Sequence, residues 1–117
     1  MEFAVEFYER QDGSSPVEEF LDELEAKRPD LYDITEMGLA KLGDRSRHGS
    51  HLTKHIGQGI YELRVGHRNI VRVLWFFVEG AKIIVVHAFV KKSEGIPSNE
   101  IQKALDRRSD YLKRDRQ

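Results

Sequence analysis

The chain has 117 residues, 33% of them charged and 39% hydrophobic, with a formal net charge of −1 and no cysteine. This length and balance fit one domain over residues 1–117, and the lack of cysteine excludes disulfides, thiolate zinc sites and cysteine nucleophiles. No apolar run approaches the roughly 20 residues of a membrane helix, and the acidic start "MEFAVEFYERQDG" is unlike a signal peptide, so we expect a cytoplasmic protein without a membrane partner.

The first predicted elements are a strand and a helix. In "EFAVEFY", apolar residues alternate with acidic ones, which indicates a half-buried strand. Ser15, Pro16 and Glu18 have the spacing of a helix start with a capping box. Apolar residues at i, i+3, i+4 and i+7 then predict an amphipathic helix: Val17, Phe20, Leu21 and Leu24.

Pro29 ends this helix and begins a second one in "PDLYDITEMGLAKLGD". Its expected inner face consists of Leu31, Ile34, Gly38 and Leu42. We expect the two helices to form a hairpin in which the glycine allows close packing against the neighbouring helix.

The second half of the chain predicts a sheet. A basic loop with a short strand near Leu52 precedes three apolar runs, 59–66, 68–78 and 82–90, which read as an antiparallel meander. Pro97 opens a final helix with an apolar face of Ile101, Ala104, Leu105 and Leu112. The order predicts an α+β fold with an antiparallel sheet of about four strands, an N-terminal helical hairpin and a C-terminal helix, the helices lying largely on one side.

Two arginines stand in the middle of predicted strands. Arg64 shares a strand face with Glu62, and Arg72 shares one with Leu74. Each arginine alone could form an ordinary ion pair, Arg64 with Glu62 or an acidic helix and Arg72 with Glu79. Two of them on one surface would form an anion site, because guanidinium groups match phosphate oxygens. The pairing register decides whether they share that surface.

The third strand, 82–90, is expected to add to this surface. Its parity places five side chains on one face: Ile83, Val85, His87, Phe89 and Lys91. Lys92 follows directly. We therefore expect the end of this row to lie beside the two arginines.

Charge is divided unevenly along the chain. Residues 1–37 contain 12 acidic and 3 basic residues, whereas residues 38–117 contain 8 acidic and 16 basic residues and all five histidines. Either the basic part faces a polyanion, or the acidic part neutralises it within the fold.

The spacing of His48, His51 and His55 resembles a metal-binding helix face. Glycines interrupt this segment and no acid is nearby, so we expect no metal site. The loop is either solvated or in contact with phosphates. We expect no cofactor.

"IYELRV", "RNIVRVLWFF" and "IIVVHAFVKKSEGIPSNEIQKALDRRSDY" together resemble the HigB-like, phage-derived branch of the RelE/ParE superfamily of type II toxins. The resemblance covers roughly residues 52–111, and "FVKK" followed by "EIQKA" is its most specific part. It implies a small α+β fold with a curved antiparallel sheet and a ribosome-dependent endoribonuclease that cleaves mRNA without metal. The implied partners are the ribosome, mRNA and a co-encoded antitoxin, expected to be of the helix-turn-helix type.

The resemblance carries over Arg64, Arg72, Lys91 and Lys92 from the family's motifs, and the roles of the other residues below are our hypotheses from strand faces and charge. The catalytic set is Arg64, Arg72, Lys91 and Glu62. The expected RNA contacts are Lys54, His55, Arg68, His87, Phe89 and Lys92. In-line attack of a ribose 2′-OH needs a base, an acid and cations for the developing charge. The arginines supply cations, Lys91 a cation or proton, and Glu62 or His87 the base.

Two other functions are compatible with the same residues. A ParE-like toxin would bind gyrase through the basic face without catalysis. A domesticated relative would bind nucleic acid without toxicity. Growth arrest separates the toxins from the relative, and message cleavage separates the two toxins.

Overall fold

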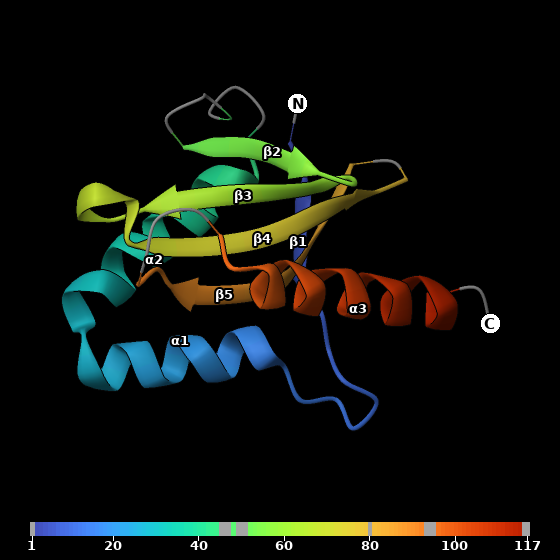
Figure 1. The fold of residues 1–117 in the computed structure, drawn as a ribbon, viewed down its shortest axis with the longest axis horizontal. Coiled ribbons are helices and arrows are strands. Elements are labelled where there is room, and N and C mark those ends of the chain that lie inside the picture. The colour runs from blue at the N-terminus through green and yellow to red at the C-terminus, as the bar shows by residue number, and fades with distance from the viewer. Residues whose placement is uncertain (1, 45–47, 49–51, 80, 93–95, 116–117) are drawn as a thin grey trace.

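The structure is a computed structural model that describes residues 2–44, 48, 52–79, 81–92 and 96–115. Its elements are β1 Ala4–Phe7, α1 Pro16–Lys27, α2 Pro29–Leu42, β2 Thr53–Gly57, β3 Ile60–Val65, β4 Val71–Val78, β5 Lys82–Val90 and α3 Ser98–Asp115. A 3-10 turn, His67–Asn69, lies between β3 and β4. The predicted order of strand, two helices, strands and helix is confirmed (Figure 1).

The strands form one open sheet in the order β1-β5-β4-β3-β2. β1 runs parallel to β5, and the other neighbouring strands are antiparallel. The expectation of about four antiparallel strands is therefore wrong, because the described sheet has five strands and is mixed. The reason is that β1 and β2 occupy opposite edges, and α1 and α2 carry the chain across one face between them.

Helices cover both faces of the sheet, so the expectation that they lie largely on one side is also wrong. α1 and α2 contribute Val17, Leu21 and Leu39 to the core on one face. α3 contributes Ala104 to a second core on the other face. In Figure 1, α3 crosses in front of the sheet and α2 passes behind it. The layer order is helices, sheet, helix.

α1 and α2 form a corner rather than a hairpin. The Ser15 hydroxyl caps α1 by accepting from the Glu18 amide at 3.1 Å, as the sequence indicates. Arg28 alone joins the two helices, and α2 then turns away behind the sheet (Figure 1). A Cβ on Gly38 would lie 2.5 Å from Val65 Cγ1, so this glycine allows α2 to approach β3 and not α1.

Two predicted core positions lie at the surface. Ile34 is 41% exposed, because the inner face of α2 turns through Leu31, Thr35 and Leu39. Leu112 is 37% exposed on α3. Within the described ranges, no helix is long and apolar enough to cross a membrane.

A β-bulge changes the parity of β5. Leu74 pairs with His87, but Trp75 pairs with Val85, which leaves Val86 as an extra residue on β5. Val85 consequently faces the α1/α2 core, whereas His87 faces α3. The predicted single row from Ile83 to Lys91 is wrong for this reason, and only its second half joins the arginine face.

Candidate functional site

The register of β3 and β4 brings the two strand arginines together. Arg64 lies directly opposite Arg72, so both side chains are on the same face of the sheet. Leu74, on the same face two residues further along β4, belongs to the core beneath α3. The arginines are therefore on the α3 side of the sheet, near its end at the 3-10 turn. This end of the sheet extends past the start of α3 (Figure 1).

Glu62 lies between the two guanidinium groups. Arg72 Nη1 donates to Glu62 Oε2 at 2.7 Å, and Arg64 Nε lies 3.6 Å from Glu62 Oε1. The Glu62 and Arg72 side chains are only 2% and 9% exposed, whereas Arg64 is 21% exposed. The carboxylate holds the Arg72 guanidinium in position through this bond, and the Arg64 side chain is the most exposed of the three. We call Glu62, Arg64 and Arg72 the arginine trio; its formal charge is +1.

His87 is held by α3 beside this trio. Its Nε2 lies 3.0 Å from Glu100 Oε1, and Arg107 Nη1 lies 3.0 Å from its Nδ1. Since a guanidinium can only donate, Nδ1 accepts and Nε2 carries the proton that Glu100 receives. Burial lowers the pKa of His87, against the opposing effect of Glu100. His87 is therefore a neutral imidazole with both nitrogens engaged.

Phe89 forms part of the floor next to the trio. It pairs with Arg72 in the β4–β5 register and stacks on His87 with ring centroids 5.4 Å apart. Only 8% of the residue is exposed, so its ring does not offer a surface for a nucleobase. Phe89 supports the site from below.

A second group of basic residues lies at the adjoining end of the sheet. The hollow there, of about 750 Å³, is lined by residues that include Arg28, His67, Arg68, Lys91 and Lys92, together with Asp30, which pairs with Arg28 at 3.2 Å. The Lys91 amide donates to the Ile70 carbonyl at 2.7 Å, which joins the end of β5 to the 3-10 turn. We call the five basic residues the basic corner. Lys91 thus lies in the corner and not in the trio.

The two basic residues of β2, Lys54 and His55, lie on opposite faces of the sheet. Lys54 pairs with Glu62 in the register and is exposed on the trio's face. His55 points to the opposite face, where its ring lies 4.8 Å from Tyr61. Lys54 could reach a ligand at the trio, whereas His55 faces away from it.

Of the remaining histidines of the basic loop, the structure describes His48, which contacts α2 and Phe3. His48 Nε2 lies 2.7 Å from the Leu42 carbonyl, and its ring stacks on Phe3. His51 lies outside the described residues. No group of three His, Asp or Glu in the described part of the chain could hold a metal ion.

Four contributing residues were not identified from the sequence. Glu100 and Arg107 share the inner stripe of α3 with the buried Ala104, at i, i+4 and i+7, and this spacing was a usable signal. Arg28 and His67 reach the corner from an interhelix link and a 3-10 turn. Their approach depends on tertiary packing that no local pattern encodes.

Glu62→Gln should destabilise the protein by about 3 kcal/mol, because it removes a buried carboxylate and leaves two guanidinium groups opposed. Urea denaturation measures this change. Glu23→Gln, which breaks the exposed pair with Lys27 on α1, should leave the midpoint unchanged. Equal effects of the two substitutions would show that the trio does not stabilise the fold.

Stability should fall as the pH is lowered through the ordinary histidine pKa of about 6.5. Because the pKa of His87 is lowered in the folded state, the unfolded chain takes up its proton first, and protonation favours unfolding. His87→Gln should reduce this slope in denaturation curves between about pH 7.5 and pH 5. His55→Gln, at an exposed position, should keep it, and an unchanged slope in His87→Gln would contradict the assignment.

Comparison with known proteins places the chain in a family. Residues 19–109 match the family described as Phage derived protein Gp49-like (DUF891). The curated proteins include no significant match. The matched segment contains the trio, His87 and the whole basic corner. The chain therefore belongs to the phage-derived Gp49-like family, which is part of the RelE/HigB-like toxin superfamily.

Proposed function

We propose that the protein is the toxin of a type II toxin–antitoxin system and acts as a ribosome-dependent endoribonuclease on mRNA. The proposal further assigns it to the HigB-like branch of the superfamily. Membership of the Gp49-like family supports a toxin with an antitoxin partner. The choice of RNA as substrate rests on the chemistry of the sheet face.

The observation that carries the proposal is the arginine trio. Arg64 and Arg72 are directly opposed and share one buried carboxylate, with a net formal charge of +1. Two planar donor groups in fixed orientation suit a phosphate whose charge increases during reaction. Arg64 has the exposure needed to meet a substrate.

In the proposed reaction, the ribose 2′-OH attacks the adjacent phosphorus and the bond to the 5′-oxygen breaks. The products are a 2′,3′-cyclic phosphate and a 5′-OH, the leaving 5′-oxygen taking its proton from solvent water. Arg64 and Arg72 stabilise the pentacoordinate phosphorane through their N–H groups, so the cations come from side chains and the reaction needs no metal. A phosphate that takes over these donors would leave a Glu62 oxygen beside the 2′-OH, and we assign Glu62 as the proton acceptor.

The basic corner extends this site into a track for the RNA backbone. Arg68, Lys91 and Lys92 line the hollow next to the trio, and Lys54 lies on the trio's face at the β2 edge. Lysine and arginine side chains on one surface neutralise the phosphates of a nucleic-acid backbone. We assign Lys91 to a flanking phosphate in place of proton transfer, and His87 and Phe89 to supporting the floor.

Arg64→Ala should reduce message cleavage at least about 100-fold, the usual effect of removing one donor to a developing oxyanion. The Arg72–Glu62 pair stays intact in this variant, so the fold should be retained. Primer extension on messages after induction, with chemical analysis of the cleaved ends, measures the effect. Arg10→Ala, which removes an exposed arginine paired with Glu19, is the matched control and should cleave normally.

Three results would contradict the proposal in different ways. A folded Arg64→Ala variant that cleaves like the wild type would remove Arg64 from catalysis. Growth arrest with intact messages and inhibited supercoiling would favour the gyrase-binding toxin. Nucleic-acid binding without growth arrest would favour a domesticated relative.

A further inference from the structure

β1 has a backbone edge that faces away from β5; it is occupied just before the strand, where the Phe3 amide donates to the Gly43 carbonyl at 2.7 Å and Glu2 bridges Asp44, and it is open at Val5 and Phe7. The Ala4 amide donates to the Ala81 carbonyl and the Tyr8 amide donates to the Val85 carbonyl, at 2.7 and 2.8 Å. In a parallel pair, alternate residues direct both backbone groups towards the partner strand. Val5 and Phe7 therefore direct their N–H and C=O groups away from β5, and no described residue pairs with them.

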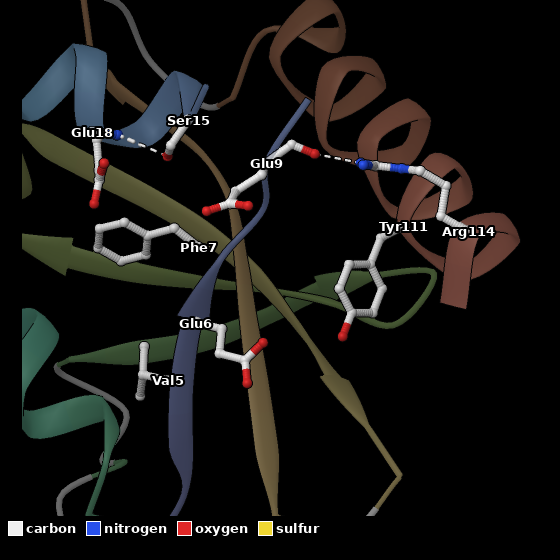
Figure 2. Close-up of a pocket in the computed structure, with 8 residues that line it drawn as sticks. All are labelled: Val5, Glu6, Phe7, Glu9, Ser15, Glu18, Tyr111 and Arg114. Atoms are coloured by element: carbon white, nitrogen blue, oxygen red, sulfur yellow. Dashed lines mark hydrogen bonds between the residues drawn. The ribbon is translucent and has the colours of Figure 1, made fainter. Parts of the chain in front are cut away.

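This edge opens into the groove drawn in Figure 2, which has a volume of about 660 Å³. Ser15 and Glu18 at the start of α1 line one side, and Tyr111 and Arg114 of α3 line the other. Arg114 donates to the Glu9 carbonyl and to Asp110, which holds the end of α3 beside the chain that leaves β1. The strand edge thus lies in a groove between two helix ends.

The two edge strands, β1 and β2, differ in how well they are protected against pairing with a further strand. β2, at the far edge, carries the exposed Lys54 and His55, and its pairing is interrupted by an irregularity between His55 and Gly57. A lysine on an edge strand and a bulge both hinder pairing with a further strand. β1 has a regular register with β5 from Ala4 to Phe7 and contains neither lysine nor proline. β1 is therefore the edge that can accept another strand.

The charges around the groove favour a basic occupant. Glu6, Glu9 and Glu18 line it, and residues 1–37 contain 12 acidic and only 3 basic residues. Glu6 pairs with Lys82 at 3.4 Å, and Arg114, the cation among the described lining residues, pairs with Asp110 at 2.8 Å, so Glu9 and Glu18 set the charge of the groove. An acidic occupant would be repelled, and an extended segment with Lys or Arg side chains would be attracted.

We propose that the open edge of β1 binds an extended, Lys/Arg-bearing segment of the antitoxin, which pairs with Val5 and Phe7 as an additional strand. This inference rests on the proposed function, which supplies the partner. The backbone groups provide the register, and the carboxylates of the groove select a basic chain. β1 and β2 are the two edge strands of the sheet, and β5 separates β1 from β4 and β3, which carry the arginine trio. Antitoxin bound to β1 therefore need not cover the trio.

Val5→Pro tests the pairing directly. Proline removes the outward N–H of Val5 and leaves the bonds of Ala4 and Tyr8 to β5 untouched. The variant should remain toxic, and the product of the adjacent gene should bind it at least about 10-fold more weakly than the wild type and fail to relieve growth arrest. Val5→Thr keeps the N–H and a β-branched side chain, so it should be neutralised normally.

Hydrogen exchange on the wild-type complex provides a reading that needs no substitution. The Val5 and Phe7 amides should exchange rapidly in the free protein and become protected when antitoxin binds. The Glu6 and Tyr8 amides face β5 and should be protected in both states. Unchanged exchange at Val5 and Phe7 on binding would overturn the inference, even if Val5→Pro failed to fold.

The outcomes separate this inference from the function on which it rests. Full neutralisation of a toxic Val5→Pro variant would overturn the docking site and leave the toxin assignment standing. A wild-type protein that neither arrests growth nor binds the adjacent gene product would end the toxin assignment, and the inference with it. Escape of Val5→Pro from neutralisation, with Val5→Thr neutralised, would support both.

Discussion

The candidate site depends on one buried carboxylate between two guanidinium groups. Arg64 and Arg72 are directly opposed across β3 and β4, a position in which like charges repel. At about 4 Å and an effective dielectric of 20, such a repulsion is on the order of 4 kcal/mol. Glu62 offsets it, with a hydrogen bond to Arg72 at 2.7 Å and an ion pair with Arg64 at 3.6 Å. The trio still has one excess positive charge, which makes it suited to an anion.

The rest of the fold holds this trio in place and leaves the Arg64 side chain partly exposed. The bulge in β5 turns His87 to the α3 side, where Glu100 and Arg107 hold both of its ring nitrogens. The floor is thus rigid and neutral beside the charged trio. The basic corner lies past the end of the sheet, where a long phosphate backbone can continue. The buried groups therefore contribute to stability, and the exposed groups are available for binding.

Local patterns in the sequence predicted the elements well, because period, caps and turns are encoded locally. Ser15 and Pro16 mark the start of α1 correctly, and the arginines were expected on one face if the register allowed it. The failures are non-local. Nothing in the sequence places β1 parallel to β5, and an inserted residue such as Val86 leaves an apolar run unchanged while it reverses the parity of the residues after it. For the same reason, the sequence did not indicate that Arg28 and His67 line the same hollow as Lys91.

The central claim is that the trio binds a phosphate, and arginine side-chain NMR tests it most directly. A short single-stranded RNA with 2′-O-methyl groups binds without being cleaved, so it can be titrated onto the protein. The Nε–H signals of Arg64 and Arg72 should shift together during the titration, while that of Arg10, which is paired with Glu19 at the surface, should stay in place. Shifts confined to Arg28 and Arg68 in the basic corner, with Arg64 and Arg72 unchanged, would contradict the claim.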